Sequence, residues 1–500
     1  MSVDKNAGHG RLVWGVSGVW IVLAIVALVR LLTLGLYPLT DTTEARYAEV
    51  ARKMVELNDW ITPWYDYGVP FWAKPPLTTW LTAISLKLFG INEFAARLPY
   101  FLLAVLIAWL VWDWVARSAG LRARREAMLT VALMSGTMLY LIASAAVMTD
   151  LGLVLGTTLA MRGFWAAFDT SESARPKEVW LLFVGLGIGM LAKGPIAVVL
   201  TGLPIGIWVL ASGNLFTVWK RLPWVKGTLL TIAIALPWYW LAEMRTPGFW
   251  EYFFIGEHWK RFTVTGWAGD KYGTAHATTR GAIWLLALAA CLPWTALLPW
   301  LAIGRKRATQ PSPVVDGPGK KAKRDWLIYL LAWGAAPCLF FTLSGNILWT
   351  YVLPALPALA ILVAGWLTLD ARHRSVDAVV ASGVLIMALL IASYFIKEQV
   401  ADSWKSAKTA VAEHRVRATQ NQPLLFVGDL PYSASFYSQG KAKAVATNAD
   451  LSARLAKSTL VPAFVALTPA QVLELTPELK TGLRLEAKSG IYSLYSPIQK

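Results

Sequence analysis

The sequence is 500 residues long, 56% hydrophobic and only 15% charged, and its mean hydropathy is +0.49. These values exclude an ordinary soluble globular protein and favour a chain surrounded by lipid. The net charge of +17 reflects 47 Lys and Arg against 30 Asp and Glu. Because the basic residues form short clusters between apolar runs instead of one continuous basic domain, we do not expect nucleic-acid binding.

Eleven apolar stretches approach the roughly 20 residues that a helix needs to cross a bilayer. They are residues 12–36, 97–116, 127–148, 151–168, 178–192, 195–211, 227–243, 281–303, 326–343, 348–369 and 376–396. Basic clusters occur in every second connection, as expected of short cytoplasmic loops. These clusters lie at 117–125, 175–177, 220–226, 305–324 and 372–374. We therefore predict a multi-pass membrane protein with a cytoplasmic N-terminus.

Two long connections fall on the predicted outer face, at 37–96 and 244–280. Within the first, residues 43–57 have helical apolar spacing and residues 77–90 are amphipathic. We expect both segments to form helices that lie along the membrane surface. Loops of this length usually carry function, so the predicted outer face is where we look for a site.

After residue 400 the composition becomes that of a soluble domain. A polar helix is expected at about 402–420, and strand-like runs occur at Leu424–Val427, Phe464–Leu467 and Ile491–Tyr495. This alternation predicts a transmembrane domain at 1–400 followed by a small α/β domain at 401–500. An odd number of spans places the second domain outside the cytoplasm.

The first group of candidate site residues is Asp41, Glu44 and Arg46, just beyond the first span. Asp41 precedes Thr42 and Thr43, so one interpretation is simply a helix N-cap. A carboxylate at the membrane edge is equally suited to bind a sugar hydroxyl, a metal ion or a cationic group.

Three further candidates interrupt apolar sequence on the same face. Lys74 precedes two prolines that stiffen the backbone, although a lysine here can also be a residue that snorkels to the interface. Asp150 lies between two apolar stretches, where turn formation is the alternative role. Lys193 is followed by Gly194 and Pro195, which end the helix. A phosphate near such a break would meet a cation and free backbone N–H groups.

The aromatic-rich segment 249–262 contains Glu257, His258, Lys260 and Arg261. An interfacial amphipathic helix has the same composition. A lone histidine here is expected to be a polar edge residue more often than a metal ligand. What these groups of residues share is their place on one predicted face of the membrane.

Several segments, in this order, resemble the GT-C glycosyltransferases that use polyprenyl-phosphate sugars. The resemblance is to the bacterial lipid A aminoarabinose transferases and their protein O-mannosyltransferase relatives. The segments are DTTEARYAEVARKM (41–54), DWITPWYDYGVPFWAKPPLTTW (59–80), AARLPYF (95–101), MTD (148–150), LAKGP (191–195), EHWKRF (257–262) and FTLSGNILWTYVLPALP (341–357).

The resemblance implies specific roles for residues in these segments. Asp41 and Asp150 would be cavity carboxylates near the reacting sugar, and Lys74, Lys193 and Arg261 would bind the donor phosphate. Residues that we assign to the substrate cavity around them are Glu44, Arg46, Tyr47, Glu257, His258 and Tyr351.

The implied fold is an all-α GT-C helical bundle in a bacterial inner membrane, with outer-face amphipathic helices and a periplasmic C-terminal domain. The implied activity moves an aminoarabinose-like sugar or a hexose from undecaprenyl phosphate to lipid A or another envelope acceptor. Membrane lipids would surround the bundle.

The sequence departs from the family pattern in two places. Ala73 stands where the family usually has a glutamate that can share a metal with the histidine matched by His258, so the sequence disfavours a divalent metal without excluding one and identifies no certain cofactor. After Ser344, the chain has Gly345, Asn346 and Ile347 where lysines are usual. This second departure predicts an acceptor that is different from, or placed differently to, ordinary lipid A phosphate.

Two alternatives remain open at this point. A protein O-mannosyltransferase-like enzyme would use the same type of donor and differ in its acceptor. A lipid or solute transporter or flippase would instead show paired broken helices and ionisable residues at mid-membrane, whereas the candidates here gather at one face.

Overall fold

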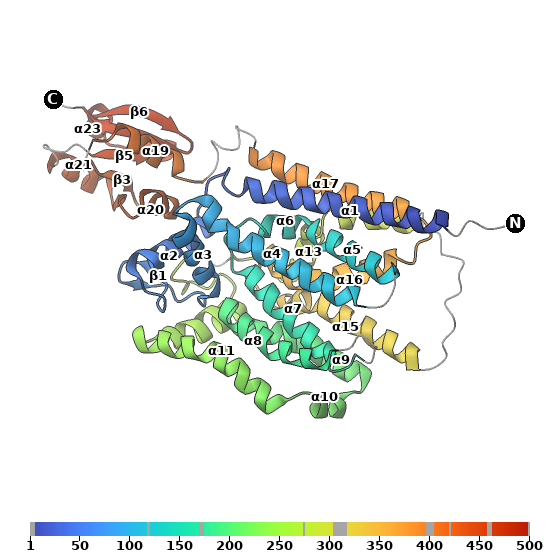
Figure 1. Cartoon of the computed structure of the whole chain (residues 1–500). Helices are drawn as coiled ribbons and strands as arrows, with labels where there is room; N and C mark the ends of the chain where they lie inside the picture. The colour runs from blue at the N-terminus through green and yellow to red at the C-terminus, as the bar shows by residue number, and fades with distance from the viewer. Residues whose placement is uncertain are drawn as a thin grey trace. The chain divides into compact units, whose positions relative to one another are not determined.

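The structure is a computed structural model of the chain and describes residues 6–117, 121–169, 175–273, 276–303, 318–396, 405–419, 422–457 and 463–498. Most of this is helical, with a small sheet near the C-terminus (Figure 1). The chain divides into two compact units. The first comprises Met1–Leu31, Pro70–Thr78 and Tyr100–Ile391, and the second Leu32–Val69, Thr79–Pro99 and Ala392–Lys500. The second unit thus combines the C-terminal segment with two pieces of the predicted outer-face connection.

Most of the helices that build the first unit, wholly or in part, follow the predicted apolar stretches. The helices of this unit are α1 (Asn6–Thr33), α4 (Glu93–Ala116), α5 (Leu121–Ser135), α6 (Met138–Ala143), α7 (Asp150–Ala166), η1 (Pro176–Val179), α8 (Trp180–Lys193), α9 (Ile196–Ser212), α10 (Leu215–Arg221), α11 (Trp224–Arg245), η2 (Glu251–Lys260), α12 (Arg261–Thr263), α13 (Ile283–Ala290), α14 (Trp294–Ile303), α15 (Pro318–Phe341), η3 (Trp349–Ala355), α16 (Leu356–Leu367) and α17 (His373–Ile396). Of these, α10, η2 and α12 lie between the predicted stretches. The predicted helical architecture is confirmed.

Four helices among the described residues are long and apolar enough to cross a membrane, namely Glu93–Ala116, Trp224–Arg245, Trp349–Leu367 and His373–Tyr394. A fifth crossing results if α13 and α14, which meet at 76°, act as one broken span. The other predicted spans form helices that are shorter, divided or flanked by charge. Residues 305–317 of the predicted basic loop lie outside the described part of the chain.

Helices α7 and α8 lie side by side (Figure 1) and approach unusually closely. A Cβ added at Gly156 would lie 2.7 Å from backbone atoms of Gly189, and one at Gly185 would lie 2.4 Å from the carbonyl oxygen of Gly156. Glycines four residues apart, Gly152 with Gly156 and Gly185 with Gly189, let two backbones pack in this way. The beginning of α7 is thereby held against the end of α8.

The predicted helix at 43–57 is confirmed as α2 (Thr43–Leu57) and the next as α3 (Leu77–Phe89). Between them, β1 (Trp64–Asp66) and β2 (Val69–Pro70) form a two-stranded sheet. The two helices differ in their surroundings. Most of α2 is buried, including its charged residues Glu49, Arg52 and Lys53, whereas Leu88 and Phe89 of α3 are exposed. The exposed apolar surface expected of a helix lying on the membrane is therefore found on α3.

The C-terminal part of the second unit contains a five-stranded sheet in the order β4-β3-β5-β7-β6. Its strands are β3 (Leu424–Val427), β4 (Lys443–Val445), β5 (Phe464–Leu467), β6 (Leu483–Ser489) and β7 (Tyr492–Pro497). Strands β4, β3 and β5 run parallel to one another, and β7 pairs antiparallel with both β5 and β6. The strands predicted at 424–427 and 464–467 are confirmed, and the third begins one residue later than predicted.

Helices cover both faces of this sheet because its strands are apolar on both sides. Leu424, Phe426 and Ala466 belong to one buried cluster, and the alternate residues Leu425 and Val465 belong to another. The helices are α19 (Lys408–Arg417), α20 (Tyr432–Ser438), α21 (Asn448–Lys457), α22 (Pro469–Leu473) and α23 (Pro477–Gly482). The predicted α/β character is confirmed.

Candidate active site

The close packing of α7 and α8 brings Asp150 and Lys193 together at one end of the helix pair. Lys193 Nζ donates to Asp150 Oδ1 at 2.6 Å, and the ammonium lies 4.8 Å from the ring centroid of Tyr351. Asp150 is in the first turn of α7 and Lys193 in the last turn of α8, so both charges suit their helix dipoles.

A second ion-pair cluster centres on Glu257, whose side chain is buried. It accepts from Lys74 Nζ and from Arg261 Nη1 at 2.8 and 2.9 Å. Burial favours the neutral form of Glu257, but Lys74 and Arg261 outweigh it and hold the pKa of this carboxyl below its usual value. The cluster therefore stays charged at neutral pH.

Asp270 also pairs with Arg261, at 3.3 Å, and its side chain is buried. Asp270 was not among the predicted site residues, although it lies in the long connection 244–280 that was expected to carry function. Glu257 and Asp270 thus both contact Nη1 of Arg261.

Asn346 clamps the segment that carries Arg261. Its Nδ2 donates to the carbonyl oxygens of Arg261 (2.6 Å) and Val264 (2.7 Å), and its Oδ1 accepts from the N–H of Gly266 at 3.0 Å. Glycine is also required at the neighbouring position 345, because a Cβ there would lie 2.0 Å from Thr265 Oγ1 in the same segment. The departure from the family pattern at 345–346 thus has a local structural role.

His258 is enclosed and is not a polar edge residue. Its Nδ1 lies 2.7 Å from the carbonyl oxygen of Phe253 and its Nε2 lies 3.2 Å from that of Lys193. Burial lowers the pKa of His258 against the opposing effects of Phe253 and Glu257. Position 194 requires glycine. Its φ is +88°, and a Cβ added there would lie 2.6 Å from Phe253 and 3.0 Å from His258.

Several of these residues line one cavity of about 390 Å³. Its polar part includes Lys74, Lys193, Glu257, His258, Arg261, Ser344, Asn346 and Tyr351. Its remaining walls are mainly apolar, and include Ile196, Val199, Phe254, Phe262, Phe340 and Phe341. The cavity therefore suits a ligand with an anionic group at one end and a hydrocarbon body.

Asp41 belongs to the second unit, and its carboxylate contacts the C-terminal part of that unit. The N–H of Ser433 donates to Asp41 Oδ1 at 3.0 Å, and the Ser433 hydroxyl bonds to Oδ2. The N-cap of α2 is Thr42, without a side-chain capping bond. The N-cap interpretation of Asp41 was therefore wrong.

The other predicted residues of this unit have different surroundings. Glu44 forms a two-pronged ion pair with Arg97, with bonds of 2.8 Å from Nε and Nη2, and Arg97 is completely buried. Arg46 lies over the ring of Tyr47, 5.4 Å from its centroid. Glu44 thus has a structural partner, while Tyr47 is 9% exposed.

No group of three or more His, Cys, Asp or Glu side chains that could hold a metal ion occurs within the described ranges. The residues of the cavity are instead cations paired with carboxylates. This donor set fits an anionic ligand bound directly by the protein.

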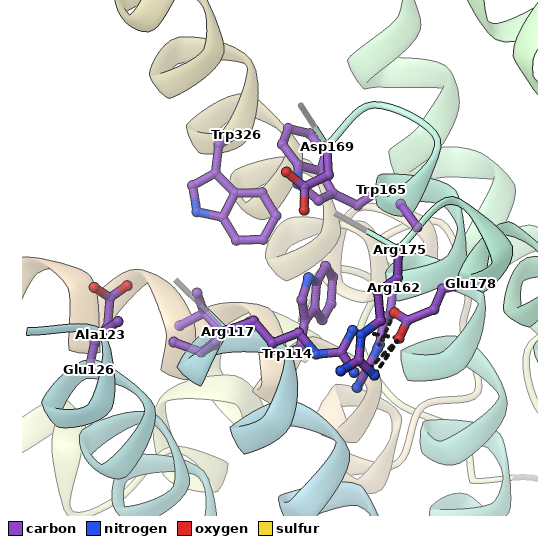
Figure 2. A pocket seen from close by; sticks show the side chains of 13 residues that line it. Trp114, Arg117, Ala123, Glu126, Arg162, Trp165, Asp169, Arg175, Glu178 and Trp326 are labelled. Atoms are coloured by element: carbon purple, nitrogen blue, oxygen red, sulfur yellow. Dashed lines mark hydrogen bonds and ion pairs between the residues drawn. The ribbon is translucent and has the colours of Figure 1, made fainter. Parts of the chain in front are cut away.

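A second cavity, of about 240 Å³, lies near the opposite end of the α7–α8 pair. Figure 2 shows Arg117 and Arg162 paired with Glu178 at its side, with the rings of Trp114, Trp165 and Trp326 nearby. Arg162 Nε and Nη2 each bond to Glu178 at 3.0 Å, and Nη2 also bonds to Asp113 at 2.6 Å. This cluster was not among the predicted sites.

Fold and cavity together describe a multi-pass helical membrane protein with a cavity that combines paired cations and apolar walls at one end of the α7–α8 pair. Residues 16–253 match the family described as dolichyl-phosphate-mannose-protein mannosyltransferase. The resemblance to this family and to the aminoarabinose transferases, expected from the sequence motifs, is confirmed.

Two curated relatives carry the name undecaprenyl phosphate-alpha-4-amino-4-deoxy-L-arabinose arabinosyl transferase. The protein of Edwardsiella ictaluri is 33% identical over 331 residues, which are 65% of this chain and 54% of that protein. The protein of Yersinia pestis is 29% identical over 373 residues, 74% of this chain and 62% of that protein. The chain thus spans between about half and three fifths of these relatives' length.

The fold is shared with ArnT from Cupriavidus metallidurans. The structure of that protein bound to undecaprenyl phosphate aligns with a TM-score of 0.75 and 20% identity, covering 96% of this chain and 98% of that one. Its apo structure aligns with a TM-score of 0.73 at the same identity.

Proposed function

We propose that this protein is a glycosyltransferase that moves a sugar, aminoarabinose-like or a hexose, from undecaprenyl phosphate to lipid A or another envelope acceptor. The observation that carries the proposal is the convergence of Lys74, Lys193 and Arg261 on one cavity with apolar walls. A polyprenyl phosphate has the same division, with an anionic head on a hydrocarbon chain. The names of the relatives support the choice of donor.

The paired state of the cations is consistent with this chemistry. In the donor the phosphate is a diester with one negative charge, and it gains a second as the bond to the sugar breaks. Cations already fixed by Glu257, Asp270 and Asp150 require little reorganisation to meet that new charge. They stabilise the transition state more than the bound donor, which is the requirement for catalysis.

The proposed roles of the two aspartates depend on the acceptor. A phosphate acceptor is already ionised and needs no strong base, so the carboxylates would then orient the sugar. A hydroxyl acceptor has to lose a proton, and Asp150 or Asp41 would receive it. Tyr47, Arg46 and Tyr351 are proposed to line the space for the sugar.

The proposal includes a topology. We place the chain in a bacterial inner membrane with the N-terminus in the cytoplasm, eleven crossings within a catalytic domain at 1–400, outer-face surface helices, and the 401–500 domain in the periplasm. Cysteine accessibility to a membrane-impermeant maleimide tests this arrangement. Labelling of a cysteine placed at exposed Leu473 from the cytoplasmic side would contradict it.

Purified protein in vesicles with a labelled undecaprenyl-phosphate sugar tests the activity directly. Arg261→Ala is expected to lower transfer by about 10²-fold or more, because it removes a charge that stabilises the leaving group. Lys260→Ala is the matched control, since Lys260 is the preceding residue and is exposed. Equal activity of the two variants would contradict the assigned role of Arg261.

Protein O-mannosyl transfer is the second candidate, favoured by the family match over residues 16–253. Mass spectrometry of lipid A and of secreted proteins, from cells with and without this protein, separates the two. A sugar lost from proteins and not from lipid A would support the second candidate.

A further inference from the structure

We propose that Ser433 of the C-terminal α/β domain is a positioning residue for the carboxylate of Asp41. This inference rests on the proposed function, in which Asp41 faces the reacting sugar. It assigns a role in the reaction to the segment 401–500. All the contacts involved lie within the second compact unit.

The hydroxyl of Ser433 has a defined direction. Its oxygen accepts the N–H of Ala407 at 2.9 Å, so its own proton is available to Asp41 Oδ2. The N–H of Ser433 donates to the other carboxylate oxygen at 3.0 Å. Two donors from one residue therefore fix both oxygens of Asp41, and hydrogen bonds to a charged acceptor are the stronger kind.

The backbone around Asp41 is held by the same domain. The N–H of Asp41 donates to the carbonyl oxygen of Lys405 at 2.7 Å. Two residues earlier, the N–H of Leu39 donates to the Tyr437 hydroxyl at 2.7 Å, and this hydroxyl in turn donates to Glu93 at 2.9 Å. The loop that carries Asp41 is thus tied to the C-terminal segment at Asp41 and at Leu39.

The residues that hold Asp41 are buried inside the second unit, so the contact is more than a surface contact. Ser433 and Ala407 are completely buried. A carboxylate in such surroundings needs compensating donors to stay ionised. Burial raises the pKa of Asp41, and the bonds from Ser433 oppose that rise.

Few other titratable groups influence this carboxylate in the structure. The backbone of Tyr432 in α20 contributes a hydrogen bond to it, and Tyr492 of β7 is close enough for its pKa to be raised by the charge on Asp41. Burial and the charge on Asp41 raise the pKa of Tyr492 to about 12, so Tyr492 stays neutral over the pH range of the assay. Removing the hydroxyl should therefore change the pKa of Asp41 itself.

The test compares Ser433→Ala with Ser435→Ala. Both are serines of α20, but the Ser435 side chain has no hydrogen bond among those that the structure describes. In Ser433→Ala we expect kcat to fall about tenfold, with the acid limb of the pH profile moved to higher pH and the KM for the donor little changed. Ser435→Ala should behave as the unaltered protein.

Two further measurements distinguish an effect on the Asp41 carboxylate from a general loss of activity. Infrared titration of the carboxylate signal that Asp41→Asn removes reports the pKa of Asp41 without any turnover, and Ser433→Ala should raise it. In an Asp41→Asn background, Ser433→Ala should have no further effect on residual transfer.

A folded Ser433→Ala protein, checked by thermal unfolding, with an unchanged pKa of Asp41 would overturn the positioning role. If Ser433→Ala does not fold, Ser433→Gly is measured in its place by the same criterion. Absence of transfer by the unaltered protein would reject the proposed function alone, since the infrared titration still tests the contact.

Discussion

The two ends of the α7–α8 helix pair both carry ion pairs, but of different kinds. At one end, Arg162 is 3% exposed and donates in a fork to Glu178, to Asp113 and to the carbonyl oxygen of Leu110. At the other end, Lys193 makes one bond to Asp150 and lines the 390 Å³ cavity.

In our proposal, the cluster around Arg162 is structural and the cluster around Lys193 binds the ligand. A buried guanidinium whose donors meet carboxylates and a carbonyl has little capacity left for a ligand. An ammonium has three donors, and among the described residues Lys193 directs one of them to Asp150. Ion pairs of similar composition thus serve folding at one end of the helices and, in our proposal, the reaction at the other.

The largest expected effect is on stability and comes from the structural end. Arg162→Met leaves Glu178 and Asp113 with one partner fewer, and breaking a buried pair costs about 3–5 kcal/mol. Thermal unfolding in detergent should show the loss. Arg175→Met is the control, because Arg175 is largely exposed and 3.9 Å from Glu178. Similar unfolding temperatures for the two variants would contradict a structural role for the cluster around Arg162.

Lys193→Gln tests the binding end. The amide can still donate to Asp150, so the unfolding temperature should change little, whereas transfer should fall by about 10²-fold. Lys220→Gln, at an exposed position of α10, should leave transfer unchanged. A Lys193→Gln protein with full activity would remove this lysine from the site.

Gly156→Ala tests whether close helix packing connects the two ends. Its Cβ would meet the backbone of Gly189 at 2.7 Å, and overpacking of this kind costs about 1–3 kcal/mol. We expect lower stability together with reduced transfer, because α7 and α8 can no longer hold Asp150 against Lys193. Gly202→Ala in α9 has open space at its Cβ and should be neutral in both assays.

The smallest effect concerns pH. The folded pKa of Glu257 lies below the ordinary value of 4.5, so its pairs with Lys74 and Arg261 contribute stability that is fully present above about pH 4.5 and is lost as the pH falls through the folded pKa. The measurement is the difference in unfolding temperature between the unaltered protein and Glu257→Gln. This difference should be the same at pH 7 and at pH 5. A difference that shrinks by pH 5 would contradict the lowered pKa.

Local patterns made much of the fold predictable. The apolar spacing at 43–57 identified α2 to the residue, and short apolar runs identified two strands. The sequence also predicted the break at Gly194 and Pro195, where α8 ends. It did not predict η3 at Trp349–Ala355 or the 76° bend between α13 and α14, which depend on tertiary packing. The glycine spacing in α7 and α8 was a visible signal of close packing that the sequence analysis did not use.

The site was predictable only as a set of residue types on one face. Lys74, Lys193 and Arg261 line one cavity as expected, although their roles remain predictions. Asn346 and Arg261 are 85 positions apart, and Asp41 and Ser433 are 392 apart. A single sequence carries no local signal for contacts of that range, because either residue alone has an ordinary explanation in a turn or a helix.

The central claim is that the cavity lined by Lys74, Lys193 and Arg261 binds the phosphate of a polyprenyl donor. A structure determined with undecaprenyl phosphate tests it most directly. We predict the phosphate within hydrogen-bonding distance of these three cations, with the hydrocarbon chain along Phe254, Phe262 and Phe340. A phosphate bound instead at Arg117 and Arg162, or away from both clusters, would contradict the account.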